Sequence, residues 1–412
     1  MSEFHDSKIH DVAVVGAGPG GSAAAYYLAR RGLDVLLLDR SEFPRDKICG
    51  DGLTPRAVGA LKEMGALDGL LAAGRRIGGV EIFAPDGSST AAPIPSQDGL
   101  PASMLVVPRV TLDNAIRERA LGSGAEFAGQ VLVSGIESTG DGVVVKGERE
   151  STPVAIKARI AIVATGAATS LLRRLGLLPK TPPMILAARG YFRSPTDFAD
   201  RIQIRFDGVP LPGYGWIFPL PNAVANVGVG FVPTARWGHR RSLTSRAAFD
   251  GFIRGRSSGP LPAGARPCDS VRSYPIRVDF PESPTSGDRI LLVGEAAGLV
   301  NPLTGEGIDY AMESARLAAE HVTAMFDQGD LSPRSVAGYD RLLRGRFERL
   351  FVFCRRARDL SQYPPVLNRL VRLAASREDL KMTLINVVLG NQPASIDLST
   401  KAILKRAFAL VR

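Results

Sequence analysis

The chain is short of cysteine, and its cysteines are not paired. Its 412 residues include three, Cys49, Cys268 and Cys354, which lie far apart and form no CxxC pair. That spacing argues against a disulfide framework, a structural zinc site and an iron–sulfur centre, so we expect no metal. It is typical of a protein from a reducing cytoplasm.

Long apolar runs are absent as well. No stretch approaches the roughly 18 apolar residues of a membrane-spanning helix. The N-terminal residues MSEFHDSKIHD contain no apolar segment, so we expect no signal peptide. We therefore expect a cytoplasmic protein, peripheral to a membrane at most.

Acidic residues are scarce near the end of the chain. The formal net charge is +10, and residues 331–412 contain 16 Lys and Arg against 6 Asp and Glu. Such a tail could meet an anionic membrane surface or be an ordinary solvated face. We expect no nucleic-acid partner, because no binding motif accompanies the charge. Arginines alternate there with apolar residues and predict a membrane-facing amphipathic surface made of Arg355, Arg356, Arg358, Arg369 and Arg372 with Phe351, Phe353, Leu367 and Leu370.

What the sequence does contain is a glycine fingerprint between a strand and a helix. An apolar run over 11–15 predicts a buried strand, and 22–32 predicts a helix. Gly16 allows a tight turn, Gly18 lets the backbone approach a pyrophosphate, and Gly21 lets the helix pack closely. An acid ends the next strand 23 residues after Gly16 and can bind ribose hydroxyls. The predicted dinucleotide site therefore comprises Gly16, Gly18, Pro19, Gly20, Gly21, Asp39 and Arg40.

A second glycine-rich region favours FAD over NAD. In GEAAGLVNPLTGEGIDYAMESA, Glu295 could reach the ribityl hydroxyls of FAD. Gly305, Gly307 and Ile308 would present a helix N-terminus to the flavin edge that becomes negative on reduction. The alternative is plain helix capping around Asn301 and Pro302.

The strand patterns predict an α/β fold of two interleaved parts. Runs at 158–167 and 288–298 look like further buried parallel strands, whereas 80–95 and 185–232 alternate with period two, as in a mixed sheet. We expect a Rossmann-type FAD-binding domain interleaved with a mixed β-sheet substrate domain, followed by C-terminal helices. The expected boundaries are 1–75, 105–180 and 280–330 for the FAD-binding domain, 76–104 and 181–279 for the substrate domain, and 331–412 for the helices.

Five segments together carry a family resemblance. They read VVGAGPGGSAAAYYLARRG, FPRDKICGDGLTPRAV, VPRVTLDNAI, PGYGWIFPL and VGEAAGLVNPLTGEGIDYAMESARLAAE. With these motifs in this order, the chain resembles the geranylgeranyl reductase family of FAD-dependent oxidoreductases, within the p-hydroxybenzoate hydroxylase-like flavoproteins. Its KICGDGLTPRAV loop is similar to that of reductases acting on the prenyl chain of menaquinone.

The resemblance implies an activity and several residue roles. It implies tightly bound FAD, NAD(P)H or another electron donor, and reduction of carbon–carbon double bonds in an isoprenoid or similar apolar substrate. It implies that Arg109 contacts the flavin and that Cys49 and Gly52 lie in a loop beside the flavin ring. Tyr214 and Trp216 match residues that line the substrate tunnel.

Two positions depart from the family pattern. Glu295 replaces the usual Asp and is one methylene longer, which should preserve the ribityl contact. Thr165 replaces an Asp linked to pyrophosphate and NAD(P)H handling.

The alternative activity is an FAD-dependent monooxygenase, a hydroxylase or epoxidase tailoring a polyketide or terpenoid, which needs a protected pocket rather than a signature residue. A prenyl-binding protein without activity would be expected to have an eroded glycine loop, and this loop is intact.

Alkene reduction narrows the candidate catalytic residues. It requires a hydride from the flavin, a proton and a dry apolar tunnel. Cys49 and Tyr214 are the candidate proton donors, with bound water as a third source, and Trp216 with Tyr214 is expected to form the cavity wall. Arg45 and Lys47 precede Cys49 in the sequence, and a nearby cation can stabilise the thiolate, which is the reactive form of a cysteine. Cys49 could equally be a small residue packed against the flavin.

Overall fold

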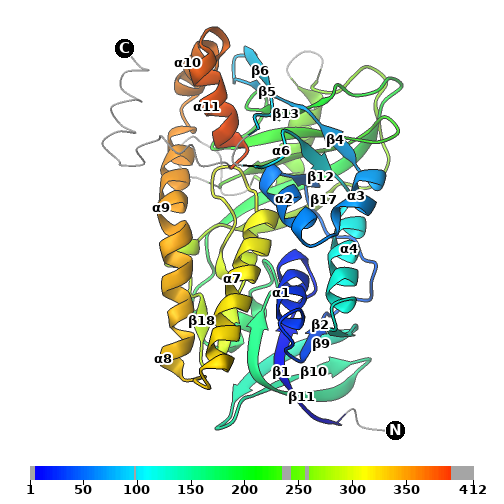
Figure 1. Ribbon diagram of the computed structural model, residues 1–412. Helices are drawn as coiled ribbons and strands as arrows, with labels where there is room; N and C mark the ends of the chain where they lie inside the picture. Colours follow the sequence, from blue (N-terminus) through cyan, green and yellow to red (C-terminus); the bar gives the residue numbers. More distant parts are fainter. Residues whose placement is uncertain (1–4, 97–98, 234–242, 256–258, 391–412) are drawn as a thin grey trace.

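The computed structural model describes residues 5–96, 99–233, 243–255 and 259–390. Within these residues the strands form two eight-stranded sheets and one small three-stranded sheet. Figure 1 shows helices packed along the sheets and a long C-terminal helix running down one side of the molecule. The fold is the mixed α/β arrangement that the sequence predicts.

The first sheet has a parallel core built from apolar runs. β1 lies between β11 and β2, parallel to both, and its residues 12–15 are buried, as a strand covered on both faces requires. An antiparallel hairpin of β9 and β10 extends β11 away from this core. The strands are β18 (Ser286–Gly287), β19 (Ile290–Leu292), β11 (Thr152–Val163), β1 (His5–Val15), β2 (Val35–Leu38), β8 (Glu126–Ala128), β10 (Val143–Arg149) and β9 (Val131–Ser138).

Helices from three separate parts of the chain meet beside this sheet. α1 packs against both α4 and α7. The two helices α1 and α7 pack closely at Gly20, where a Cβ would lie in van der Waals contact with Cβ of Ala311 at 3.4 Å. The helices of this region are α1 (Pro19–Ala29), α2 (Pro55–Glu63), α3 (Leu67–Ala73), α4 (Arg109–Leu121), α5 (Ser170–Arg174) and α7 (Ile308–Asp327), with the short turns η1 (Phe280–Glu282) and η2 (Gly294–Ala297).

The second sheet is mostly antiparallel and has a buried layer on each face. One face packs against α6 (Ser245–Arg254), whose Phe249 and Phe252 are buried there. The other face packs against the last two helices. The strands are β16 (Arg266–Pro267), β12 (Met184–Arg193), β15 (Val224–Phe231), β14 (Gly213–Leu220), β13 (Arg201–Arg205), β5 (Gly79–Phe83), β6 (Ser89–Pro93) and β17 (Arg272–Arg277). The small sheet, order β3-β7-β4, joins Gly52–Leu53, Met104–Val106 and Arg75–Ile77.

The C-terminal segment is helical as far as it is described. α10 and α11 both pack against β6, at the top of Figure 1, while α9 packs against α7 and η1. Residues 391–412 of the predicted helical region lie outside the described residues. The helices are α8 (Pro333–Val336), α9 (Gly338–Leu360), α10 (Pro364–Ser376) and α11 (Glu378–Val388).

The predicted membrane-facing surface on these helices is wrong for two of its four apolar residues, Phe351 and Leu367, whereas Phe353 and Leu370 are half-buried. Phe351 is 0% exposed and Leu367 is 5% exposed, because both turn inward onto the protein core. Several of the arginines pair with acids elsewhere in the chain, Arg355 with Glu282 and Arg372 with Asp86. In the described part of the chain, no helix is both long enough and apolar enough to cross a membrane.

Candidate functional site

The glycine loop after β1 forms a cradle that only glycine fits at two points. Gly16 has φ +105°, and a Cβ there would lie 2.6 Å from the carbonyl oxygen of Ala164. A Cβ on Gly21 would overlap the carbonyl oxygen of Gly16. α1 begins at Pro19 with Gly18 as its N-cap, so its first N–H groups point out of the helix end. This strand–loop–helix end is the arrangement that binds a pyrophosphate.

Charged side chains complete the cradle. Asp39 Oδ2 accepts a hydrogen bond of 2.8 Å from the N–H of Ala17, which ties the end of β2 to the loop. The guanidinium of Arg45 lies 3.8 Å from where a Cβ on Gly18 would be, and it pairs with Asp113 at 2.8 Å. Arg45, which the sequence analysis placed near Cys49, is thus a cation beside the cradle, where it could meet a phosphate group. Arg40 is exposed at the edge of the site.

One cavity of about 840 Å³ joins this cradle to an apolar chamber. Every predicted site residue except Gly21 lines it: Gly16, Gly18, Pro19, Gly20, Asp39, Arg40, Cys49, Gly52, Arg109, Tyr214, Trp216, Glu295, Gly305, Gly307 and Ile308. Residues more than 250 positions apart thus meet around one space. The described residues contain no group of His, Cys, Asp and Glu that could hold a metal ion.

The chamber lies between the second sheet and the last two helices. Its sheet side is aliphatic and aromatic, and α10 and α11 close the opposite side. A wall of this kind offers no hydrogen bonds and suits a long apolar ligand. The lining residues include Ile82, Met104, Ile202, Ile204, Phe206, Phe218, Leu370, Val371, Leu384 and Val388.

Glu295 lies at the carboxyl end of the parallel strands. Its Oε1 accepts a 3.0 Å hydrogen bond from the N–H of Arg277, and Oε2 lies 3.8 Å from Nζ of Lys47. Thr165, the other departure from the family pattern, donates its hydroxyl to the carbonyl of Ala168 at 3.2 Å. Both residues line the cavity, and the hydroxyl of Thr165 also stabilises the turn in which it lies.

The cation beside Cys49 is Arg109, rather than the sequence neighbours Arg45 and Lys47. Arg109 is buried, lies near enough to Cys49 for an electrostatic interaction, and forms a bidentate pair with Asp113 at 2.6 and 2.8 Å. Arg45 is engaged by Asp113, and Lys47 stacks on the ring of Tyr274 at 4.3 Å. The hypothesis that Arg45 and Lys47 flank the thiol is thus replaced by a contact from α4.

Tyr214 and Trp216 both give their polar hydrogens to protein acceptors. The hydroxyl of Tyr214 donates to the carbonyl oxygen of Thr304, and Nε1 of Trp216 donates to Oδ1 of Asn226 at 2.9 Å. Burial raises the pKa of Tyr214 above its ordinary value of 10. These contacts fit the two aromatic residues as walls of the cavity.

A buried carboxyl lies one residue beyond the Cys49–Gly50 turn. Asp51 is 0% exposed and adopts φ +65°. Its Oδ2 accepts hydrogen bonds from the hydroxyl of Tyr191 at 2.6 Å and from Nδ2 of Asn226 at 2.8 Å, while the same amide nitrogen donates to the carbonyl of Cys49. Its Oδ1 is buried and finds no hydrogen-bond partner among the described residues. Burial raises the pKa of Asp51 to about 6.

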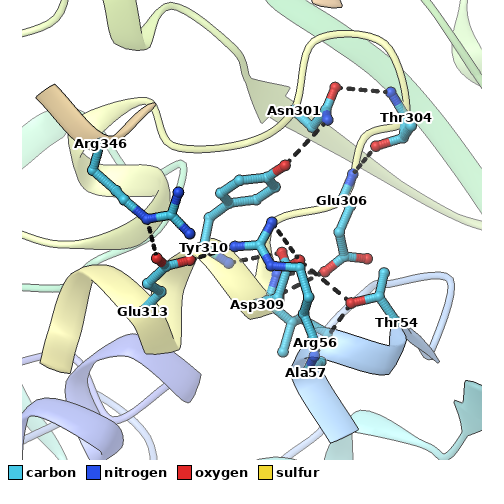
Figure 2. Close-up of polar contacts among 11 residues, drawn as sticks. Thr54, Arg56, Ala57, Asn301, Thr304, Glu306, Asp309, Tyr310, Glu313 and Arg346 are labelled. Carbon is cyan, nitrogen blue, oxygen red and sulfur yellow. Dashed lines mark hydrogen bonds and ion pairs between the residues drawn. The ribbon is translucent and has the colours of Figure 1, made fainter. Parts of the chain in front are cut away.

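The turn before α7 holds a second acid, the half-buried Glu306, which the sequence did not single out. Figure 2 shows it among the polar groups between α2 and α7. Its Oε1 accepts hydrogen bonds from the N–H groups of Ile308 at 2.8 Å and Asp309 at 3.3 Å. The N–H of Ile308, expected to face the flavin edge, is therefore bound by Glu306 in this structure.

A chain of charges leads from this point to the surface. Asp309 accepts from the hydroxyl of Thr54 and lies 3.5 Å from the guanidinium of Arg56. Arg56 also pairs with Glu313, which pairs with the half-exposed Arg346 (Figure 2). The sequence offered no signal for this network, because its members come from α2, α7 and α9.

The residues present fit FAD. A glycine cradle, a helix end, and Arg45 beside it suit a pyrophosphate, and the carboxylates of Asp39 and Glu295, both on residues that line the cavity, suit the hydroxyls of FAD. Residues 10–188 match the family model described as an FAD binding domain. Fold, site and match together define an FAD-binding oxidoreductase.

Comparison with known proteins places the chain more narrowly. It is 35% identical to the menaquinone reductase of Mycolicibacterium smegmatis, over 92% of this chain and 91% of that protein. It is 30% identical to digeranylgeranylglycerophospholipid reductase 1 of Methanothermobacter thermautotrophicus, over 81% and 82%. The crystal structure of a geranylgeranyl bacteriochlorophyll reductase-like protein from Thermoplasma acidophilum superposes with a TM-score of 0.78 at 25% identity, over 98% and 96%. The chain belongs to the geranylgeranyl reductase family of FAD-dependent oxidoreductases.

Proposed function

We propose that this protein reduces carbon–carbon double bonds in the isoprenoid chain of a lipid or quinone. The observation that carries the proposal is the single cavity that joins the dinucleotide cradle to an apolar chamber. FAD, when bound and reduced, supplies two electrons and one hydrogen for this chemistry. The named relatives act on menaquinone and on a digeranylgeranyl lipid, both of which carry isoprenoid chains.

The proposal assigns roles to the predicted residues. Asp39 and Glu295 would bind the hydroxyls of FAD, and Arg109 would lie against the flavin beside Cys49. Tyr214 and Trp216 would hold the alkene by forming an apolar wall that excludes water. The N-terminal sheet and its helices (1–75, 105–180 and 280–330) would carry FAD, and the second sheet (76–104 and 181–279) would carry the substrate.

We propose NAD(P)H as the electron donor, as the family resemblance implies. Thr165 in place of an acid makes the donor worth testing directly. The bound flavin should bleach without oxygen when NADPH or NADH is added, and dithionite serves as the positive control. Bleaching by dithionite alone would contradict this part of the proposal.

The reductase activity itself is tested by adding an alkene to the reduced holoenzyme without oxygen. A geranylgeranyl lipid that lacks a quinone ring should restore the oxidised flavin spectrum, because its double bond accepts the electrons. The missing ring matters, since a quinone could oxidise the flavin directly. Conversion of substrate only in the presence of oxygen would instead indicate a monooxygenase.

We also propose that the basic C-terminal helices touch an anionic membrane surface while the enzyme collects its substrate. Exposed arginines such as Arg369 support this, although the buried Phe351 and Leu367 take no part. The protein should sediment with anionic vesicles and be released by salt. Equal binding to neutral vesicles would contradict an electrostatic contact.

A further inference from the structure

The reaction needs a proton as well as a hydride, and Glu306 is an acid placed beside the cavity that could supply it. Glu306 lies on the wall of the cavity, in the turn that precedes α7. Its neighbour Gly305 faces Tyr214 on the chamber wall, since a Cβ on Gly305 would lie 3.6 Å from the hydroxyl oxygen of Tyr214. The turn that carries Glu306 therefore lies beside Tyr214 on the cavity wall.

The contacts of Glu306 decide which oxygen carries the proton. Both backbone donors, from Ile308 and Asp309, bind Oε1. A neutral carboxyl keeps its carbonyl-type oxygen for donors and its proton on the other oxygen. The proton is thus placed on Oε2.

The charges around Glu306 favour its neutral form. The groups that face it are Asp309 on α7, Arg56 on α2 and Tyr214 on β14. Burial raises the pKa of Asp309 as well, but its ion pair with Arg56 and its hydrogen bonds from Tyr310 N–H and Thr54 make Asp309 the better stabilised carboxylate of the two. Burial first, and then the charge of Asp309, raise the pKa of Glu306 to about 8.

Resting on the proposed function, we propose that Glu306 is the catalytic acid that protonates the substrate. As the double bond is reduced, one carbon receives a hydrogen with its electron pair from the reduced flavin. The π electrons then form the second C–H bond with the proton of Glu306, whose O–H bond breaks and leaves a carboxylate. Solvent restores the proton, and the charged chain Asp309–Arg56–Glu313–Arg346 marks the side from which it arrives (Figure 2).

The test compares Glu306→Gln with wild type in a single anaerobic turnover of the dithionite-reduced holoenzyme with a geranylgeranyl lipid. Glutamine keeps the acceptor for the two N–H groups but has no acidic proton. We expect flavin reoxidation to slow at least about 100-fold, which is the lower range of general acid catalysis. The wild-type rate should fall above about pH 8, and the residual rate of the variant should not. Wild-type rates in Glu306→Gln would overturn the proposal.

A second readout does not depend on activity. The infrared C=O band of a protonated carboxyl should be present in the wild-type holoenzyme at pH 7 and absent in Glu306→Gln. Its persistence in the variant would overturn the assignment. If wild-type flavin is not reoxidised by the lipid at all, the proposed function fails, while this band still tests the protonation of Glu306.

Two further variants guard against a structural artefact. Glu282→Gln is the matched control, because Glu282 is 58% exposed and pairs with Arg355 at the surface. It should change neither the rate nor the infrared band. Glu306→Asp keeps an acid one methylene shorter, so it should be slower than wild type but keep the loss of rate at high pH. Should Glu306→Gln fail to fold, a pH-independent Glu306→Asp rate would overturn the proposal.

Discussion

At the scale of single residues, the buried Asp51 depends on donors from distant strands. Tyr191 lies on β12 and Asn226 on β15, which the second sheet places side by side. They hold Asp51 behind the Cys49 turn, and Gly50 packs there against Trp216 and Phe218. The family resemblance placed the loop of Cys49 and Gly52 beside the flavin, but the sequence could not indicate these partners of Asp51, because they lie 140 and 175 residues away.

The first prediction concerns Tyr191→Phe. Removing a hydrogen bond to a buried carboxyl should lower the free energy of unfolding by about 1–3 kcal/mol. Because folding raises the pKa of Asp51 from 3.8 to about 6, its favourable contribution is complete below pH 3.8 and is lost as the pH rises through 6. The ionised form needs the donor more, so the loss in Tyr191→Phe should be larger at pH 8 than at pH 5 in urea unfolding.

The control for this prediction is Tyr339→Phe. Tyr339 is also buried, but its hydroxyl meets the carbonyl oxygens of Leu292 and Ser314, which do not titrate. Its loss of stability should be the same at both pH values. The same pH dependence in both variants would contradict the account of Asp51.

The second prediction concerns Cys49. If Glu306 supplies the proton, Cys49→Ala and Cys49→Ser should keep their flavin. Their single-turnover rates should fall by much less than the ~100-fold expected when a general acid is removed. Arg109 would remain held by Asp113 in both variants. A loss of that size or more in Cys49→Ala, measured in single turnovers, would assign the proton to the thiol instead.

At the scale of elements, the glycine loop and its flanking strand and helix were predictable because the pattern is local. Gly16 to Asp39 lie within one β1–α1–β2 unit, and the spacing alone places them together. The faces of α9 and α10 that pack against the rest of the protein were not predictable in the same way. Arginines interleaved with Phe351 and Leu367 read as an exposed amphipathic surface, and only the packing of α9 against α7 and η1 and of α10 against β6 decides which side faces inward.

The third prediction tests the cradle with Gly16→Ala. A side chain at φ +105° costs about 1–3 kcal/mol of strain, and its Cβ would also press on the carbonyl of Ala164. The loop must move, so the purified variant should contain little FAD by its visible absorbance. Gly32→Ala is the control, with φ +82° but open space around the added Cβ. It should lose some stability and keep its FAD; equal FAD content in both variants would contradict the cradle.

The fourth prediction tests the helices that close the chamber. Val388 on α11 lines the cavity, and Val388→Trp should fill part of the space meant for the substrate. The KM for a geranylgeranyl lipid should rise about tenfold or more, equivalent to at least about 1.4 kcal/mol. The FAD content should stay unchanged.

Val366→Trp makes the same substitution on α10 at a position that is not among the residues lining the chamber. Its KM should remain near the wild-type value. An equal rise in both variants would mean that the helices are merely destabilised, which contradicts their role as the chamber wall.

At the scale of the whole molecule, the fold brings four distant parts of the chain around one cavity. Strong local motifs predicted the fold class, the FAD cradle and the aromatic wall at Tyr214 and Trp216. The acids Asp51 and Glu306 were missed, because the removal of solvent and the neighbouring charges that shift their pKa values act only in the folded chain. The local sequence around an acid in a glycine-rich loop does not indicate whether its carboxyl group is exposed to solvent or buried.

The central claim is that electrons pass from the flavin to a carbon–carbon double bond in this cavity. The most direct measurement is the mass of the lipid after one anaerobic turnover with dithionite-reduced holoenzyme freed of excess reductant. The account predicts a geranylgeranyl lipid heavier by two hydrogens, formed in proportion to the flavin that is reoxidised. An unchanged lipid beside flavin that stays reduced, or a product that gains oxygen only in air, would contradict it.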